Sequence, residues 1–277
     1  MNNTPIKELL NFSILNVDKP TGPTSFQVSQ LIREWFNLNK TSHFGTLDPM
    51  VSGVLPVALG RACRLSSVFM QRNKTYVGIM RVHKEISDKE LNEVVKKFIG
   101  KITQLPPVRS SVKRAERIRE VISFNILERN DMDILFETEV EAGTYIRKLC
   151  DDMGKLIGGA HMLELRRTKA SIFNESESYT LYDIQNALNA LKKGNETLIR
   201  KMLIPAKEAI VNIMPKVQLK DFAVKKILTG KPLMANDLTE KEPEEDIYAV
   251  FHKTQFVAVM KKAKSGDIIS RPEFVFN

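Results

Sequence analysis

Residues 43–59 read HFGTLDPMVSGVLPVAL and place one carboxylate, that of Asp48, in a turn between two apolar runs. An Asp-Pro pair initiates a turn, and the glycine at position 45 lets the backbone approach a neighbour closely or adopt a positive φ. The run from residue 54 to 59 is too apolar for a surface loop, so it predicts a buried wall behind Asp48. These residues alone leave two readings open: a carboxylate presented to a cleft, or a turn that Asp48 only closes through an Asx hydrogen bond.

The composition is that of a globular protein with an acidic partner. The chain has 277 residues, of which 43% are hydrophobic and 27% charged, enough for one large domain or two. Its 42 Lys and Arg residues against 33 Asp and Glu give a net charge of +9. The basic residues cluster between residues 61 and 119, whereas residues 240–246 are mainly acidic. This excess favours nucleic acid as the partner, with the basic section as the RNA footprint.

The sequence predicts neither a membrane-spanning helix nor a secretory signal, and neither a metal site nor a cofactor site. No apolar run approaches the roughly 20 residues that a membrane-spanning helix requires. The N-terminus lacks a secretory signal, so we expect a cytoplasmic chain without membrane association. The two cysteines are isolated and the four histidines widely separated, which predicts a reducing compartment and no metal site. The sequence contains no Gly-rich phosphate-binding motif, and we expect no cofactor.

Apolar periodicity along the chain predicts an α+β protein. A buried strand at residues 13–17 leads through a Pro- and Gly-rich turn into a helix that Thr24 or Ser25 can cap. From residue 216 onwards, short apolar runs between polar turns predict a small β-rich second domain. We expect further helices at residues 61–72 and after Tyr145, the latter ending at residues 158–159, and two more that begin at Ser87 and Thr180. Further strands are expected at residues 74–83, 121–129 and 133–141.

The run from His43 to Ala62, HxGTLDPxxSGVLPVALGRA, resembles the nucleophile motif of the tRNA pseudouridine synthase B family. The match is closest to the dyskerin branch, the catalytic subunits of archaeal and eukaryotic box H/ACA ribonucleoproteins. Bacterial members carry an insertion after the strand at 74–83, which this chain lacks. Further runs resemble other motifs of the family in the expected order: NVDKPTGPTS at 16–25, KxYVxxMxxH at 74–83, AGTYIR at 142–147 and AHMLELRRT at 160–168.

The resemblance implies a role for individual residues. Its implied catalytic residues are Asp48, Tyr76, Arg147 and Leu165. Asp48 supplies the carboxylate, and Arg147 is the cation that keeps it ionised in a dry pocket. The ring of Tyr76 stacks on the target base, and Leu165 forms an apolar wall. Lys19, Gly45 and Thr46 are implied to support this wall. From the residues alone, Arg147 could instead be a surface arginine that pairs with Asp151 one helical turn on.

The basic stretch QxPPVRSSVKR at 104–114 resembles the thumb loop of the family, a mobile arm that closes on bound RNA. Its two prolines break regular structure, and it has few apolar residues for core packing. The plainer alternative is a solvated charged loop. The RNA-binding residues implied by the resemblance are His43, Arg109, Lys113, Arg114 and Arg117.

The resemblance also implies an architecture and a function. We expect a pseudouridine synthase catalytic domain at residues 1–214, with a mixed or antiparallel sheet flanked by helices, and a small PUA-like RNA-binding domain at 215–277. The expected reaction is the isomerisation of uridine to pseudouridine in rRNA or tRNA, within a guide-RNA-directed box H/ACA particle. The implied partners are substrate RNA, guide RNA, the small H/ACA core proteins and a kink-turn-binding protein.

Two alternatives stay open at this point. One is a stand-alone synthase that modifies the T-loop uridine of tRNA, and the other is a non-catalytic RNA-binding scaffold. The absence of lysine-rich tails favours an archaeal-type protein, since such tails are typical of eukaryotic dyskerins, which are nucleolar.

Overall fold

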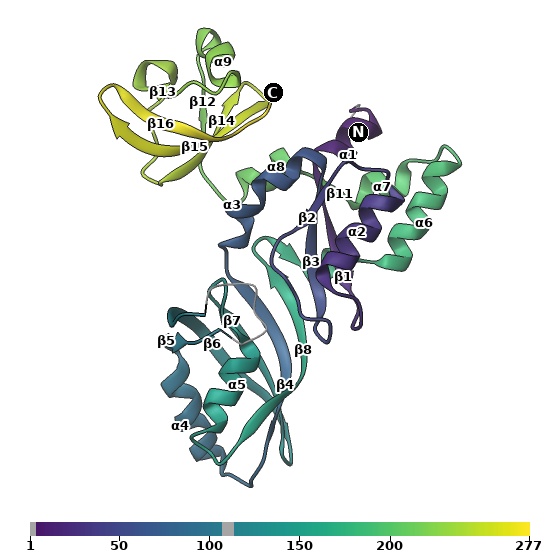
Figure 1. Cartoon of the computed structure of the whole chain (residues 1–277), viewed down its shortest axis with the longest axis vertical. Helices are drawn as coiled ribbons and strands as arrows, with labels where there is room; N and C mark the ends of the chain where they lie inside the picture. The colour runs from purple at the N-terminus through teal and green to yellow at the C-terminus, as the bar shows by residue number, and fades with distance from the viewer. Residues whose placement is uncertain (1–3, 107–113) are drawn as a thin grey trace. The chain divides into compact units, whose positions relative to one another are not determined.

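A computed structural model describes residues 4–106 and 114–277 of the chain (Figure 1). The chain divides into two compact units, residues 1–203 and residues 204–277. The predicted α+β class, a mixed sheet flanked by helices followed by a small β-rich unit, is confirmed. Among the described residues, no helix has the length and apolar character that crossing a membrane requires.

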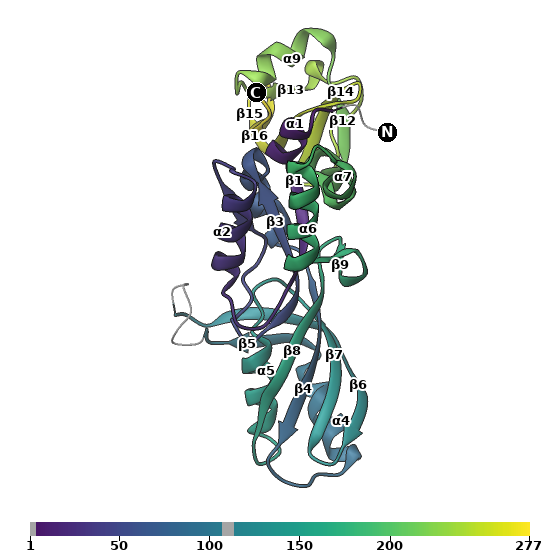
Figure 2. The same ribbon diagram turned by 90° about the vertical axis from the view of Figure 1, so that its right-hand side faces the viewer.

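The first unit is built on one twisted sheet. Its strands are β1 (Ser13–Lys19), β2 (Thr41–His43), β3 (Ser52–Leu59), β4 (Lys74–Val82), β5 (Gly100–Gln104), β6 (Arg117–Asn130), β7 (Asp133–Val140), β8 (Ala160–Ala170), β9 (Phe173–Asn174), β10 (Tyr179–Thr180) and β11 (Leu203–Pro205). The main path runs β10-β1-β3-β8-β4-β7-β6-β5, with β11 added on β1, β2 on β3 and β9 on β8. Figure 2 shows β4, β6, β7 and β8 side by side. The strand β8 therefore joins the half of the sheet that contains β3 to the half that contains β4.

The helices of this unit begin at clear local signals. Thr24, Ser87 and Thr180 each cap a helix with the side-chain oxygen, and in each case the residue three positions later completes a capping box. The helices α4 and α5 lie beside each other against the β4–β7 half of the sheet (Figure 1). The helices are α1 (Ile6–Asn11), α2 (Ser25–Trp35), α3 (Ser66–Met70), α4 (Asp88–Phe98), α5 (Ile146–Gly154), α6 (Leu181–Lys192) and α7 (Thr197–Met202), with 3₁₀ turns η1 (Gly60–Leu65) and η2 (Glu175–Glu177).

Two predicted helices differ from the observed ones. The helix expected at 61–72 is a 3₁₀ turn followed by the short α3, and the hydroxyl of Ser66 donates a hydrogen bond of 2.6 Å to the Cys63 carbonyl at the junction. The helix after Tyr145 ends at Gly154 rather than at residues 158–159. A side chain at Gly154 would come within 2.2 Å of the Ala160 backbone nitrogen, so the chain already turns back into β8 at that residue.

The second unit has its own sheet and core. Its five-stranded sheet has the order β12-β14-β15-β16-β13. Tyr248 is fully buried there, and its hydroxyl group is 2.8 Å from both the Glu242 carboxylate and the Ser270 hydroxyl. The elements are α8 (Ala206–Val211), β12 (Lys216–Gln218), α9 (Asp221–Leu228), β13 (Leu233–Met234), η3 (Ala235–Asp237), β14 (Ile247–His252), β15 (Gln255–Ser265) and β16 (Ile268–Val275). The boundary between the two compact units lies between residues 203 and 204, whereas the predicted second domain begins at residue 215.

Candidate active site

Asp48 and Arg147 form an ion pair in which Arg147 Nη2 donates to Asp48 Oδ2. Asp48 lies in the loop between β2 and β3, and Arg147 in the first turn of α5. Asp151, the alternative partner, instead faces the amines of Lys148 and Lys155 at 3.6 and 3.3 Å. The tertiary fold therefore gives Arg147 a partner from another part of the chain.

The ion pair is open to solvent in the chain alone. The side chains of Asp48 and Arg147 are 55% and 56% exposed. The described residues thus do not form the expected dry pocket around the Asp48 carboxylate.

The backbone on both sides of Asp48 is held by buried side chains. The Ser25 hydroxyl accepts a hydrogen bond from Leu47 N–H at 2.8 Å and donates one to the Leu47 carbonyl at 2.9 Å. On the other side, Lys19 Nζ donates to the Pro49 carbonyl at 3.2 Å and to the Pro20 carbonyl at 2.7 Å. Both Ser25 and Lys19 have no exposed surface, and burial lowers the pKa of the Lys19 amine. The loop is therefore anchored immediately before and after the carboxylate.

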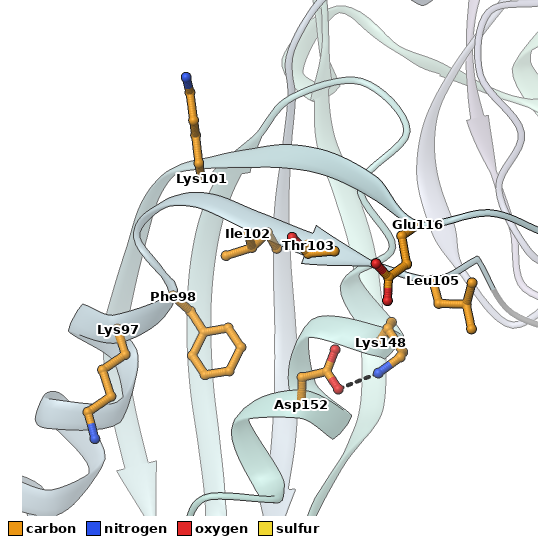
Figure 3. A pocket seen from close by; sticks show the side chains of 9 residues that line it. All are labelled: Lys97, Phe98, Lys101, Ile102, Thr103, Leu105, Glu116, Lys148 and Asp152. Atoms are coloured by element: carbon orange, nitrogen blue, oxygen red, sulfur yellow. Dashed lines mark hydrogen bonds and ion pairs between the residues drawn. The ribbon is translucent and has the colours of Figure 1, made fainter.

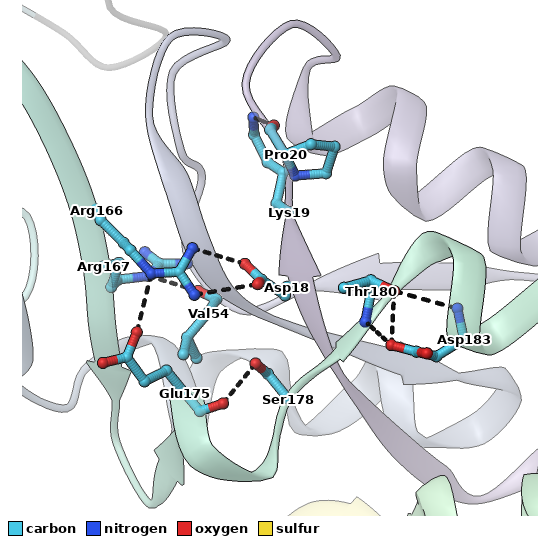
Figure 4. Close-up of polar contacts among 10 residues, drawn as sticks. All are labelled: Asp18, Lys19, Pro20, Val54, Arg166, Arg167, Glu175, Ser178, Thr180 and Asp183. Atoms are coloured by element: carbon cyan, nitrogen blue, oxygen red, sulfur yellow. Dashed lines mark hydrogen bonds and ion pairs between the residues drawn. The ribbon is translucent and has the colours of Figure 1, made fainter.

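Arg167 ties this loop to the centre of the sheet. Its side chain is buried, and it donates to the Val54 carbonyl at 2.8 Å (Figure 4). It also donates to the Gly45 carbonyl at 2.9 Å. Gly45 has a φ of +94°, and a Cβ at that residue would be 3.3 Å from Arg167 Nη1. At Gly53 a Cβ would be 2.2 Å from the Arg167 carbonyl oxygen. The two glycines thus allow the close approach of β8 to the Asp48 loop.

Arg166 points into a separate set of charges. It makes two hydrogen bonds to the Asp18 carboxylate, at 2.9 and 3.0 Å, and a third to Glu175 at 2.9 Å (Figure 4). Its contacts connect β8 with β1 and η2. Both adjacent arginines therefore bind other parts of the protein: Arg167 binds the Asp48 loop, and Arg166 binds β1.

Tyr76 and Leu165 lie on neighbouring strands and share one face of the sheet. Tyr76 on β4 is in register with Arg167 on β8, and Gly78 is in register with Leu165. Residues two apart on a strand face the same side, so the register puts Tyr76 and Leu165 diagonally across from each other. Both are 8% exposed. Since Arg167, the partner of Tyr76, binds the Asp48 loop, this face of the sheet is connected to the ion pair.

His43 is fixed by two neighbouring hydroxyl groups. Its Nδ1 is 3.0 Å from Ser29 Oγ, and its Nε2 is 3.1 Å from Thr46 Oγ1. Burial, and then the nearby positive charge of Arg167, lower the pKa of the His43 imidazole. The ring therefore orients Thr46, two residues before Asp48, and is favoured in its neutral form.

Lys74 is a second buried lysine near this site. Burial, and then the positive charge of Arg167, lower the pKa of its amine to about 8. The amine donates to the carbonyls of Met70 and Arg72 at the end of α3. The amines of Lys74 and Lys19 thus both donate hydrogen bonds to backbone carbonyl groups.

The residues implied to bind RNA are only partly covered by the structure. Arg114 is exposed and Arg117 is half-buried at the start of β6, whereas Arg109 and Lys113 lie outside the described residues. A cavity of about 470 Å³ lies nearby, between α4, β5 and α5 (Figure 3). Its described lining contains none of the residues predicted to be catalytic; they are Lys97, Phe98, Lys101, Ile102, Thr103, Leu105, Glu116, Lys148 and Asp152.

Ser25 and Arg167 have no role in the sequence-based set, although both hold the Asp48 loop. Arg167 has a signal only once residues 160–170 are known to form a strand, because two adjacent arginines on a strand point to opposite faces. Ser25 was considered only as a helix cap, and Thr24 takes that position. Within residues 4–106 and 114–277, no group of three or more His, Cys, Asp or Glu side chains is arranged to hold a metal ion.

Comparison with known proteins gives matches over most of the chain. Residues 33–146 match the model of the TruB family pseudouridylate synthase (N terminal domain), and residues 147–211 match that of the tRNA pseudouridylate synthase B C-terminal domain. A relative from Methanopyrus kandleri, named "Probable tRNA pseudouridine synthase B", is 41% identical over 252 residues, which cover 89% of this chain and 74% of the relative. A relative of the same name from Thermococcus onnurineus is 42% identical over 275 residues, covering 96% of this chain and 82% of the relative.

Two solved structures are similar over almost the whole chain. A chain of a Cbf5–Nop10–Gar1 complex has a TM-score of 0.91 at 38% identity, covering 99% of this chain and 88% of that chain. A chain of an H/ACA ribonucleoprotein bound to a substrate RNA containing 2′-deoxyuridine has a TM-score of 0.87 at 36% identity, with coverages of 99% and 88%.

Proposed function

This chain belongs to the TruB family of pseudouridine synthases, isomerases that act on RNA, and we propose that it is the catalytic subunit of a guide-RNA-directed box H/ACA ribonucleoprotein. The observation that carries this proposal is the similarity to one chain of a Cbf5–Nop10–Gar1 complex over 99% of the present chain, which includes the second unit. The proposed partners are substrate RNA, guide RNA, small core proteins similar to Nop10 and Gar1, and a kink-turn-binding protein.

The proposed chemistry is assigned to the exposed ion pair and the face of the sheet behind it. The target uridine must leave its helix to reach the carboxylate. Asp48 then attacks or stabilises the electron-poor sugar or base, as a carboxylate does in covalent catalysis. The bond between ribose C1′ and uracil N1 breaks, a bond from C1′ to C5 forms, C5 loses its proton and N1 gains one. Arg147 favours the ionised carboxylate because it is an adjacent opposite charge.

Tyr76 and Leu165 are assigned to the detached base. An aromatic face is needed to hold the base while it turns, and an apolar wall is needed to keep it from diffusing away. The two residues lie on adjacent strands with little exposed surface, which supports this assignment. The bound RNA would supply the cover that the ion pair lacks in the chain alone.

Affinity for RNA is assigned to the basic section, and sequence choice to the guide. Arginine and lysine contacts to phosphates give affinity without reading a sequence. Arg114, which is exposed beside β6, is one such residue, and Arg109 and Lys113 are further candidates from the sequence. The β-rich second unit is proposed to be a PUA-like RNA-binding domain.

A second candidate function is that of a stand-alone tRNA synthase acting on the T-loop uridine. The relatives from Methanopyrus kandleri and Thermococcus onnurineus favour it, because both are named for tRNA modification. This activity requires the same chemistry at Asp48 but neither a guide nor a partner protein.

One experiment separates the two functions. The purified chain is incubated with a tRNA transcript carrying tritium at uracil C5, and separately with guide RNA, partner proteins and a guide-complementary RNA labelled in the same way. The proposal predicts tritium release at the guide-specified uridine only when guide and partners are present. Guide-independent release from bare tRNA at a comparable rate, with none from the guide-complementary RNA, would establish the stand-alone function instead.

A further inference from the structure

Gln104, the last residue of β5, makes a two-point contact with the backbone of Tyr145. Its Oε1 accepts a hydrogen bond from Tyr145 N–H at 3.0 Å, and its Nε2 donates one to the Tyr145 carbonyl at 3.2 Å. The Gln104 residue is 3% exposed. One buried amide thus pairs with both backbone polar groups of a residue 41 positions away, as a neighbouring strand otherwise does.

Tyr145 is the residue that sets the start of α5. It is the N-cap of this helix, and its side chain makes no capping hydrogen bond. Its carbonyl accepts the first helical hydrogen bond, from Leu149 N–H at 2.9 Å, in addition to the one from Gln104. Arg147 lies two residues later, in the first turn. The position of the Tyr145 backbone therefore controls the direction in which the Arg147 side chain leaves the helix.

The contact between Gln104 and Tyr145 lies beside a cavity. Thr103 and Leu105, on either side of Gln104, line the cavity of about 470 Å³ together with Lys148 and Asp152 of α5 (Figure 3). A cavity provides no packing contact that would fix the two elements relative to each other. The buried amide of Gln104 thus supplies a direct connection at the edge of this cavity.

We propose that Gln104 is a positioning residue for the reaction, which holds the start of α5 so that the Arg147 guanidinium meets Asp48. This inference rests on the proposed roles of Asp48 and Arg147. Gln104 itself touches neither the ion pair nor the substrate in this assignment, and it acts through the Tyr145 backbone. Its contribution is expected in kcat, because a small misplacement of a catalytic group lowers the rate without removing the phosphate contacts that bind RNA.

The first test compares Gln104→Ala with the native chain and with Leu188→Ala. Leu188 is buried in α6, so its truncation destabilises the core away from α5 and serves as the control for stability. Well below the melting temperature of each variant, Gln104→Ala is expected to lower kcat on the labelled RNA by roughly 10- to 100-fold, with KM within about threefold. Leu188→Ala is expected to keep kcat within about twofold of the native value, since its effect is on stability alone.

A second variant tests the hydrogen-bond pattern itself. In Gln104→Glu, an ionised carboxylate can accept from Tyr145 N–H but cannot donate to the Tyr145 carbonyl, whereas a protonated carboxyl group can do both. Burial raises the pKa of such a group, so protonation falls within reach of the assay. The ratio of the variant's kcat to the native kcat is therefore expected to rise as the pH is lowered from 8 to 5.

A spectroscopic readout separates this inference from the function on which it rests. With ¹⁵N-labelled arginine, the Nη signals of Arg147 report restricted rotation of a guanidinium held by a carboxylate, and Asp48→Asn is expected to remove that restriction. Gln104→Ala is expected to change the same signals, and Leu188→Ala to leave them unchanged. If Arg147 signals and kcat in Gln104→Ala equal the native ones, the inference is overturned. If Asp48→Asn retains native activity, the proposed catalytic role of Asp48 is wrong, whatever the result for Gln104. In that case the Arg147 signals in Gln104→Ala still decide whether Gln104 positions the Arg147 side chain.

Discussion

Asp48 and Arg147 are 99 residues apart in the chain, yet their side chains form an ion pair. The sequence alone placed Asp151 within reach of Arg147, because a residue four positions on lies on the same helical face. In the structure Asp151 pairs with lysines, and Arg147 reaches across to the loop before β3. Only the family resemblance, and no local rule, anticipated that Asp48 and Arg147 act together.

At the same scale, the guanidinium geometry of Arg147 can be tested. Arg147→Ala is expected to reduce pseudouridine formation by at least about 100-fold, because it removes the ion-pair partner of Asp48. Arg147→Lys keeps the charge but not the planar fork, so it is expected to recover only part of the rate. Tritium release at saturating RNA measures both. Near-native turnover in Arg147→Ala would remove Arg147 from the catalytic set.

His43 provides a pH-dependent test of the loop. Its pKa is lowered by burial and by the charge of Arg167, so the folded chain binds fewer protons than the unfolded chain between that lowered pKa and 6.5. Stability from this group therefore rises with pH through that window and is lost as the pH falls below about 6.5. We expect the free energy of unfolding in urea to fall less steeply with decreasing pH in His43→Gln than in the native chain. Parallel curves between pH 5 and 8 would contradict this origin of the effect.

At the scale of elements, local signals and long-range pairing contributed differently. The starts of the helices capped by Ser87 and Thr180 were predicted, and Thr24 was one of two predicted caps for the first helix, because a cap is defined by a few neighbouring residues. β8 was identified only as a motif, not as a strand. Its hydrogen bonds run to β3 on one side and β4 on the other, and nothing local in residues 160–170 specifies these partners.

The same limit applies to the supports of the site. Lys19 was assigned a structural role, and the structure puts its amine on the Pro49 carbonyl next to Asp48. Ser25 and Gln104 hold backbone groups of residues that are 22 and 41 positions away, and neither was assigned this role from the sequence. A buried polar side chain that bonds to distant backbone has no periodic signature, since its partner is defined only by the folded chain.

Gly78 on β4 is a position where a substitution is expected to disturb the contact between β4 and β8. A Cβ there would be 2.8 Å from Leu165 Cδ1 and 2.9 Å from the Glu164 carbonyl oxygen. Gly78→Ala is therefore expected to push Leu165 and the β8 backbone away from β4, with a loss of about 1–3 kcal/mol in stability. It should also lower kcat. Val77→Ala, on the opposite face of the strand, is the control and should leave kcat near the native value. Equal kcat values for the two variants would show that Leu165 does not depend on this gap.

At the scale of the whole molecule, the net charge of +9 and the open ion pair point to a site that RNA completes. Binding dominated by phosphate contacts falls steeply with salt, and each neutralised phosphate contributes about 0.7–0.9 to the magnitude of the slope of log K against log salt. Arg114→Gln is expected to reduce the magnitude of this slope by about one and to lower the affinity for all RNA sequences by a similar factor. Arg129→Gln is the matched control, because Arg129 already pairs with Asp88. Identical slopes for Arg114→Gln and the native chain would exclude a phosphate contact by Arg114.

The decisive measurement is made on Asp48→Asn, with pseudouridine formation and RNA affinity determined on the same preparation. Asparagine preserves the size of the side chain but removes the charge that the proposed chemistry requires. We expect no pseudouridine above background, with a Kd for RNA within about tenfold of the native value because phosphate contacts carry the binding. Native turnover by this variant, or a loss of RNA binding that accounts for the lost activity, would contradict the assignment of Asp48 as the catalytic carboxylate.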